Sequence, residues 1–337
     1  MDGLMMGLAA DFLGKPIWLW LVFMSIVVAL LVFDLGVFHK EEREIGVRES
    51  LVLSAGYIAI AMVFGVWVWW YLGETSGLNF FTGFFVEKTL ALDNVFVISL
   101  IFTYFAIPRL YQHRVLFWGI LGVILLRGIM IGVGAALVSQ FAWILYIFGA
   151  FLIFTGVKML FAADHETSSI GDNPILKFLR KRMRVTDELH GHDFFVRKPV
   201  TPGGKPLLHA TPLFLALILV ELADVVFAVD SVPAIFAITT DAFIVYTSNI
   251  FAILGLRALY FALAAMIHRF KYLKYALSGV LVFIGGKIFY TQFFGKMPAE
   301  ISLSVTIGML AAGVIYSLYR TKREEAANPP PATQPTR

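Results

Sequence analysis

Cysteine is absent from the 337-residue chain, which excludes disulfide bonds and thiolate metal sites. Charged residues are scarce as well, because they make up only 15% of the sequence, whereas hydrophobic residues make up 59%. A soluble domain of this length cannot bury so much apolar surface. The composition therefore indicates a polytopic membrane protein.

Motifs for nucleotide hydrolysis and for common hydrolytic enzymes are also missing. The sequence has no Gly-x4-Gly-Lys-[Ser/Thr] loop, no His-Glu-x-x-His element and no Gly-x-Ser-x-Gly element. We therefore expect no built-in ATPase and no enzyme. All seven histidines fall outside the long apolar segments, which argues against a zinc or copper pathway.

Nine apolar segments are long enough to cross a bilayer, which requires about 20 residues of helix. Helices are expected because lipid leaves unpaired backbone groups unsatisfied. The sequence therefore predicts an all-α fold with nine transmembrane helices. The predicted segments are 17–38, 51–72, 80–106, 115–138, 141–161, 212–239, 243–267, 273–294 and 301–319.

Lysine and arginine are concentrated in every second connection between these segments. The connection 162–210 carries eight of them, whereas the connections around Gly73, Ser139 and Thr240 carry none. Because basic residues mark the cytoplasmic side, we expect the N-terminus outside and the C-terminus in the cytoplasm.

This assignment divides the chain into six parts. Residues 1–79 hold two transmembrane helices, 162–211 form a basic cytoplasmic loop, and 295–320 hold the final transmembrane helix. Residues 321–337 are expected to be a disordered cytoplasmic tail. The remaining two parts, 80–161 and 212–294, are the predicted repeats described below.

Within the basic loop, Ile175–Arg184 is predicted to be an amphipathic helix on the inner leaflet. Residues Phe194–Lys198 and Pro206–His209 flank a Pro-Gly-Gly turn, which predicts a small hairpin.

The two central parts align with each other as an internal repeat. Asp93-Asn94-Val95 matches Asp230-Ser231-Val232, and Arg127 matches Arg257. Further along, the pairs Gly156 with Gly285 and Lys158 with Lys287 keep one register. The predicted orientation makes the two repeats inverted, an architecture of secondary transporters that bind substrate at the bilayer midplane.

Acidic residues inside these apolar segments predict the site. Each charge at mid-bilayer costs about 2.5–3.5 kcal/mol, so the acids need protons, the arginines or a bound cation as partners. Asn94 and Ser231 add neutral oxygens, and an all-oxygen set suits Mg, Ca or Mn. The alternative is a set of structural ion pairs with Arg127, Arg257 and Lys88. The acids are Glu87, Asp93, Glu221, Asp224 and Asp230.

Helical spacing predicts which of these groups share a face. Glu87 and Asn94 are seven residues apart, and so are Asp224 and Ser231, whereas Asp93 and Asp230 would lie about a third of a turn off those faces in a straight helix. We therefore expect a local distortion, or a second ligand position, at Asp93.

Two further expectations concern proline and lysine. Pro233 cannot donate to the carbonyl of Val229, so its helix is expected to open near Asp230. Lys158 and Lys287 are expected to snorkel towards the membrane surface.

Several motifs resemble the bacterial TerC family of integral membrane proteins. They are Phe33-Asp34-Leu35-Gly36-Val37, the Glu87-x5-Asp93-Asn94 pair, Glu221-x2-Asp224-x5-Asp230-Ser231-Val232-Pro233, and Ser248-Asn249-Ile250-Phe251-Ala252. The resemblance covers about residues 10–320, and the second-half motif is highly specific. Ala242 departs from the family pattern, in which a proline often follows the aspartate.

The resemblance implies an integral protein of the bacterial inner membrane. The family is named for tellurium resistance, and several members are linked to manganese export, to metalloprotein loading and to alkaline conditions. Its acidic site residues would map onto Glu87, Asp93, Glu221, Asp224 and Asp230.

Together these observations predict a divalent-cation exporter with Mn²⁺ as the transported ion and no resident cofactor. Protons are the expected counter-ion, exchanged at the same acids. Two alternatives remain. One is a transporter of another solute, such as calcium, a basic amino acid or an oxyanion. The other is a non-transporting scaffold for stress response or metal loading, with membrane-protein partners bound through loop 162–210.

Overall fold

The protein is described by a computed structural model that covers residues 11–38, 46–141, 143–161, 174–199, 206–264, 272–295 and 297–327. Within these residues the chain forms ten helices and two short hairpins. The helices are α2 Ile17–Phe38, α3 Val47–Leu72, α4 Glu74–Tyr104, α5 Arg109–Gln140, α6 Ile144–Phe161, α7 Pro174–Arg182, α8 Pro212–Phe236, α9 Ala242–Ala264, α10 Leu273–Phe294 and α11 Ala299–Ala327. The strands are β1 Asp11–Phe12, β2 Lys15–Pro16, β3 Phe195–Pro199 and β4 Pro206–Ala210.

Each of the nine predicted segments coincides with a long helix among the described residues. Six helices (α3, α5, α6, α8, α10 and α11) are long and apolar enough to cross a membrane. Helices α2 and α9 contribute shorter apolar stretches, Ile17–Phe33 and Ala242–Leu256. Helix α4 carries Glu87, Lys88 and Asp93 in its middle. That all nine helices cross the bilayer therefore stays a prediction.

The structure differs from the all-α prediction at its periphery. Strands β3 and β4 pair antiparallel, with Phe195 opposite Ala210, which confirms the predicted hairpin. A second hairpin, β1–β2, precedes the first long helix. Helix α11 continues to Ala327, beyond the predicted end of the final span at 320. Its last turns are rich in lysine, arginine, glutamate and alanine, which are good helix formers.

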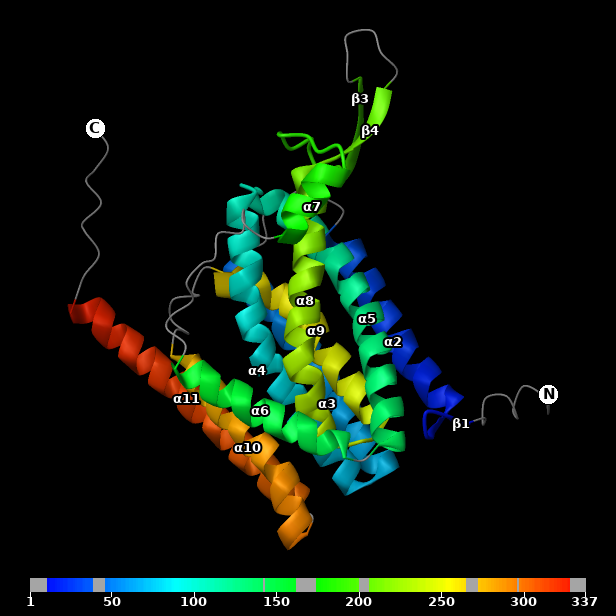
Figure 1. The fold of residues 1–337 in the computed structure, drawn as a ribbon, viewed down its shortest axis with the longest axis vertical. Coiled ribbons are helices and arrows are strands. Elements are labelled where there is room, and N and C mark those ends of the chain that lie inside the picture. The colour runs from blue at the N-terminus through cyan, green and yellow to red at the C-terminus, as the bar shows by residue number, and fades with distance from the viewer. Residues whose placement is uncertain are drawn as a thin grey trace, which may run out of the picture.

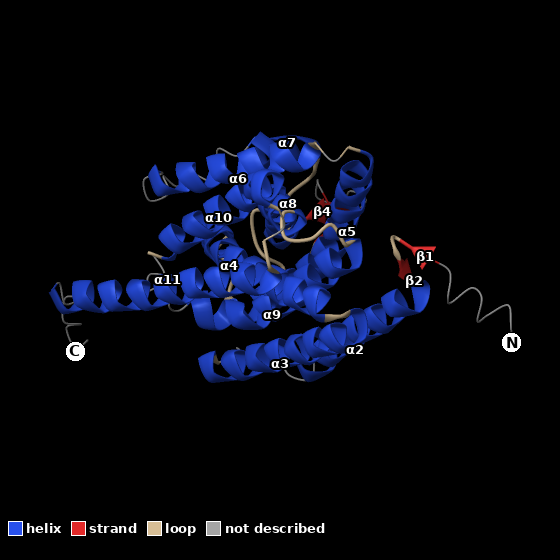
Figure 2. Ribbon diagram, turned by 90° about the horizontal axis from the view of Figure 1, so that it is seen from below, coloured by secondary structure: helices blue, strands red, loops and turns tan. Residues whose placement is uncertain are grey.

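The long helices form one bundle with the two hairpins at opposite ends (Figure 1). Helix α7 and the β3–β4 hairpin stand at one end, and the β1 strand lies near the other. Seen from below, α2 and α3 form an outer layer beside α9, while α6 lies on the opposite side (Figure 2). Helices α4, α5, α8 and α9 pack against one another between these layers.

Helix α7 packs on the bundle through its apolar side, which changes the expectation that it lies on lipid alone. Leu176 is only 1% exposed and belongs to the same apolar cluster as residues of α4 and α8. Ile175 and Phe178 remain exposed, and the Arg182 guanidinium lies 5.9 Å from the centre of the Phe178 ring. The apolar surface of α7 is thus divided between the protein and its surroundings.

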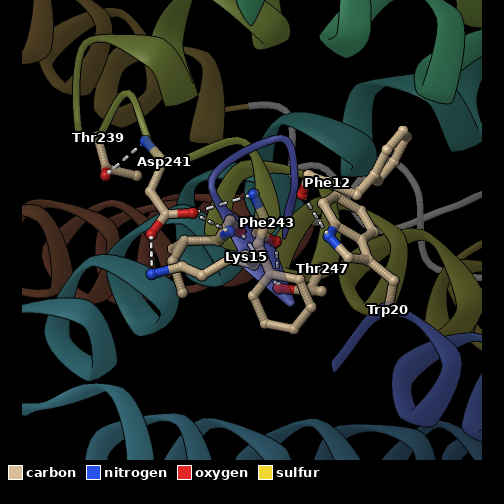
Figure 3. A network of polar contacts seen from close by, with 8 residues as sticks. Phe12, Lys15, Trp20, Thr239, Asp241, Phe243 and Thr247 are labelled. Atoms are coloured by element: carbon tan, nitrogen blue, oxygen red, sulfur yellow. Dashed lines mark hydrogen bonds and ion pairs between the residues drawn. The ribbon is translucent and has the colours of Figure 1, made fainter. Parts of the chain in front are cut away.

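The N-terminal hairpin is pinned to the start of α9 (Figure 3). Lys15 Nζ lies 3.0 Å from Asp241 Oδ2, while Asp241 Oδ1 accepts the backbone N–H of Phe243 at 3.0 Å. Asp241 therefore caps the helix N-terminus, where backbone donors lack intrahelical partners. Trp20 Nε1 donates to the carbonyl of Phe12 at 3.0 Å and closes the hairpin onto α2.

Helices α6 and α10 cross at small residues in a reciprocal manner. The backbone of Gly149 lies against Gly285, and Ser278 Oγ donates to the carbonyl of Gly156. The alignment of the repeats pairs Gly156 with Gly285 and Gly149 with Ser278. The contact between Gly149 and Gly285 therefore corresponds to the contact between Ser278 and Gly156. As residue numbers rise along α6 they fall along α10, so the helices run antiparallel. This reciprocity is typical of elements related by a two-fold axis, whereas inversion of the whole repeats stays a prediction.

The crossing predicts different outcomes for two adjacent glycines of α10. A Cβ at Gly285 would lie 2.6 Å from the carbonyl oxygen of Gly149, so Gly285→Ala must push α6 and α10 apart. We expect a loss of about 1–3 kcal/mol, the usual cost of overpacking. The measurement is the thermal unfolding midpoint of the purified protein in detergent, which should fall by several degrees.

Gly286→Ala is the matched control, because a Cβ there meets nothing within 4 Å. Alanine also costs less backbone entropy than glycine in a helix, so its midpoint should be unchanged or slightly raised. Equal midpoints for the two variants would contradict the close crossing.

Candidate ion-binding site

A buried ion pair joins α4 to α5 in the middle of the bundle. Arg127 Nη1 lies 2.7 Å from Glu87 Oε1, and the two side chains are 2% and 1% exposed. Glu87 is therefore a fully buried carboxylate whose charge is balanced by a guanidinium. Removing both groups from water is costly, so the pair depends on good geometry and on additional hydrogen bonds.

Those additional bonds come from the other half of the chain. Arg127 Nη1 donates to Asn249 Oδ1 on α9 at 2.6 Å and to Ser231 Oγ on α8 at 2.9 Å. Asn249 Nδ2 in turn donates to Glu87 Oε2 at 3.3 Å. Glu87, Arg127 and Asn249 thus form a closed triangle of contacts that ties three helices together.

A second polar contact links α4 to α8, about two turns beyond Glu87 along α4. Asn94 Nδ2 donates to Asp224 Oδ1 at 3.2 Å. Asn94 Oδ1 is buried and has no hydrogen-bond partner. Because Glu87 and Asn94 both reach partners in the opposite repeat, the prediction that they share one helix face agrees with the observed contacts.

Glu221 lies on α8 against a glycine pair of α5. A Cβ at Gly122 would overlap the Glu221 carboxylate, and a Cβ at Gly119 would lie 3.9 Å from Glu221 Oε1. Glu221 Oε2 is buried without a hydrogen-bond partner. The carboxylate therefore occupies space that exists only because α5 carries no side chain there.

Two small cavities flank Asn94. One, of about 30 Å³, is lined by Asn94, Gly119 and Asp224 among apolar side chains. The other, of about 60 Å³, is lined by Glu87, Asn94, Arg127 and Ser231 on the side facing α6 and α10. Either one can hold a water-sized particle, for which about 10–15 Å³ suffices.

Three predicted site residues have side chains outside the described part of the structure, namely Asp93, Asp230 and Arg257. Their positions on α4, α8 and α9 are known, but their contacts are not, so the predicted distortion at Asp93 stays a prediction. Among the described side chains, no three histidines or carboxylates lie close enough together to hold a metal ion by themselves.

The other buried cations whose side chains the structure describes do not neutralise the acids. Lys88 Nζ donates to a backbone carbonyl, that of Ala252 on α9, at 3.1 Å. Lys287 is buried between α10 and α11 and donates to Ser302 Oγ at 3.1 Å, so the expectation that it snorkels was wrong. Tight packing of α11 over α10 closes the route by which its side chain would reach the membrane surface.

Helix α8 runs without interruption from Pro212 to Phe236, with Pro233 inside it. The predicted opening near Asp230 is therefore not observed. Pro233 removes one backbone donor, that to the Val229 carbonyl, near the end of the helix, and regular bonding resumes with Ala237 N–H donating to the Pro233 carbonyl at 3.0 Å.

The site is rich in negative charge and in oxygen atoms. Among the described side chains, neither Glu221 nor Asp224 forms an ion pair with a lysine or arginine, whereas Glu87 does. Among the described side chains of the site, three carboxylates thus accompany one guanidinium, and any negative charge on Glu221 and Asp224 has to be balanced by protons or by a cation. Carboxylate and amide oxygens are hard ligands that favour Mg, Ca or Mn over softer metals.

Asn249 is the functional candidate that the sequence reasoning missed. It is fully buried and contacts both members of the Glu87–Arg127 pair. The sequence indicated this residue as a lone amide in an apolar segment, at the position that aligns with Gly119 in the first repeat.

Comparison with known proteins places the chain in a family. Residues 72–325 match the model of the integral membrane protein TerC family. An uncharacterized membrane protein of Myxococcus xanthus, STKORF319, is 48% identical over 92% of this chain and 94% of its own length. A protein of Escherichia coli K12 named "Putative membrane-bound redox modulator Alx" is 47% identical over 93% of this chain and 97% of its own length.

No solved structure matches the chain. The family match covers well over half of the sequence, and the similarity to both relatives extends over nearly their whole length. The protein is therefore a member of the TerC family of integral membrane proteins.

Proposed function

We propose that this protein exports divalent metal cations across the bacterial inner membrane, with Mn²⁺ as its main substrate. The observation that carries the proposal is the group of acids at the meeting of α4, α5 and α8, in which Glu87 is buried and Glu221 and Asp224 are half-buried. Asp224 and Glu221 have no basic partner among the described side chains, and two oxygens beside them, Asn94 Oδ1 and Glu221 Oε2, lack hydrogen-bond partners. Unpaired oxygens of this kind are what a hard cation requires.

In this proposal the ion is held at the bilayer midplane and reaches each side in turn. Asp93 and Asp230, which belong to the same helices α4 and α8, complete the set of carboxylates. The residues contributed by the two repeats move relative to each other, so that the site opens to one side at a time.

Export against a negative-inside potential costs about 2.3 kcal/mol per charge per 100 mV. Proton entry in exchange for the metal would offset that cost, because the same carboxylates bind either protons or the cation. The N-terminus would then lie outside and the basic loop 162–210 in the cytoplasm, where membrane-protein partners could reach it.

The name of the Escherichia coli relative suggests an effect on redox balance for that protein. This chain contains no cysteine, so thiol exchange by its own residues is excluded. Under our proposal any such effect in this protein would follow from the metal that it moves.

The test is Mn²⁺ uptake into everted inner-membrane vesicles. We expect uptake that depends on the protein, and at least a roughly tenfold lower rate for Asp93→Ala and Asp230→Ala, because removal of a charged ligand costs more than about 1.4 kcal/mol. Uptake equal to that of vesicles without the protein would sink the proposal. Competition by calcium, a basic amino acid or tellurite would identify another substrate instead.

A variant of the basic loop separates a transporter from a scaffold. Lys181→Gln combined with Arg182→Gln removes charges at the end of α7, a helix that lies at one end of the bundle beside the β3–β4 hairpin (Figure 1). A transporter should keep its Mn²⁺ uptake in this variant. A scaffold would instead lose its cellular role in this variant and keep it in the two aspartate variants.

A further inference from the structure

Arg127 holds Glu87 in a way that does not resemble a permanent structural bridge. An arginine has five N–H donors and usually grips a carboxylate through two parallel bonds. Here the contacts to Glu87, Ser231 and Asn249 are all made by one nitrogen, Nη1. Arg127 Nε is buried with no partner, and Glu87 Oε1 has no hydrogen-bond partner of good geometry despite the ion pair. A buried group left unpaired in this way is costly.

The same contacts keep Glu87 from acting as a ligand. Oε1 lies 2.7 Å from Arg127 Nη1 in the ion pair, Oε2 accepts a hydrogen bond from Asn249, and the side chain is almost fully buried. A cation can take Glu87 only if Arg127 withdraws. The cavity of about 60 Å³ that borders both Glu87 and Arg127 gives the guanidinium room to do so.

Charge balance gives the exchange its direction. With Arg127 in place, two negative charges remain on Glu221 and Asp224 among the described carboxylates. When a divalent cation enters and also takes Glu87, the three carboxylates, the cation and Arg127 together are neutral, but the displaced guanidinium is left without a carboxylate partner in a low-dielectric site. Such a charge favours either the return of Arg127 or the departure of the ion.

We propose that Arg127 is a tethered cation that competes with the transported ion for Glu87 and thereby expels it. The inference rests on the proposed function and adds a release step to it. Because Ser231 and Asn249 belong to the opposite repeat, the return of Arg127 to Glu87 also re-forms contacts among α4, α5, α8 and α9. Release of the ion is in this way linked to closure of the bundle.

The experiment measures binding and transport separately in the full-length protein, with Mn²⁺ alone as the probe. In Arg127→Gln, Glu87 loses its competitor, so we expect about tenfold tighter Mn²⁺ binding by calorimetry in detergent and about tenfold slower transport in proteoliposomes. A role confined to holding the helices together would weaken binding and transport together. Weaker or unchanged binding therefore overturns the inference.

Two further variants keep the result decisive. Asn249→Ala removes the amide that fixes Arg127 against Glu87, so it should also tighten Mn²⁺ binding. This variant takes the place of Arg127→Gln if Arg127→Gln does not fold. Arg114→Gln is the matched control, because Arg114 lies on the same helix but stacks on the Phe194 ring at 5.3 Å, outside the site. Its binding and transport should equal those of the wild type.

The proposed function and the release step fail in different ways. Wild-type protein that neither binds nor moves Mn²⁺ would contradict the proposed function and, with it, the release step. Wild-type protein that transports Mn²⁺, together with an Arg127→Gln variant that binds no more tightly, would contradict the release step alone.

Discussion

Replacement of Glu87 by alanine is expected to abolish transport and to destabilise the protein by about 3–5 kcal/mol, the usual cost of removing one partner from a buried ion pair. Arg127 would be left with its charge buried and with only Ser231 and Asn249 as partners. The measurements are Mn²⁺ uptake into everted vesicles and the thermal unfolding midpoint in detergent. A midpoint close to that of the wild type would contradict the burial of this pair.

Two controls separate the fold from the function. Thr82→Ala removes another buried polar group of α4, but among the described residues Thr82 bonds only to the Leu78 carbonyl of its own helix, at 2.8 Å, so little stability should be lost. Glu87→Leu combined with Arg127→Met removes both charges. It should recover most of the stability, since apolar replacements of a buried pair are often neutral or stabilising, yet it should not restore transport.

Replacement of Gly122 by valine is expected to reduce Mn²⁺ uptake at least about tenfold, since displacement of one ligand carboxylate costs more than about 1.4 kcal/mol. Even a Cβ at this position would overlap the Glu221 carboxylate. The side chain of Glu221, which extends from α8, would have to give up its position against α5 and move away from Asp224. Uptake into everted vesicles, normalised to the amount of folded protein, is the measurement.

Gly132→Val on the same helix provides the comparison, because a Cβ at Gly132 meets nothing within 4 Å. Both substitutions place the same β-branched residue in the same helix, so any effect on helix propensity is shared. Equal uptake by the two variants would show that the position of Glu221 does not matter for transport.

Much of the fold followed from periodicity and composition. Apolar runs of about 20 residues are strong signals because the bilayer leaves few alternatives to a helix. Each predicted segment accordingly coincides with a long helix of the described structure, from Ile17–Phe38 to Ala299–Ala327. The β3–β4 hairpin also followed from local signals, because its two strands are neighbours in sequence and flank a Pro-Gly-Gly stretch.

The outcomes that differed from expectation depend on neighbours distant in the sequence. Lys287 was expected to reach the membrane surface, but α11 covers it and Ser302 accepts its hydrogen bond. Leu176 of the basic helix α7 packs on the bundle rather than on lipid alone. In each case the residue's own sequence neighbourhood carried no information about the element that packs over it.

The sequence alone determined which residues are candidates for the site. A carboxylate in an apolar helix is costly wherever it points, so Glu87, Glu221 and Asp224 stand out from spacing and composition alone. It also determined that Glu87 and Asn94 share a face, because helical geometry fixes the direction of side chains seven residues apart.

Only the tertiary structure decided how the charges are paired. Arg127 could have balanced any of several acids, but the packing of the bundle brings it to Glu87 of α4, with Asn249 of α9 completing the contact. Glu221 and Asp224 are left without a basic partner among the described side chains. Charge pairing acts over a few ångströms between helices far apart in the sequence, and spacing along one helix cannot specify it.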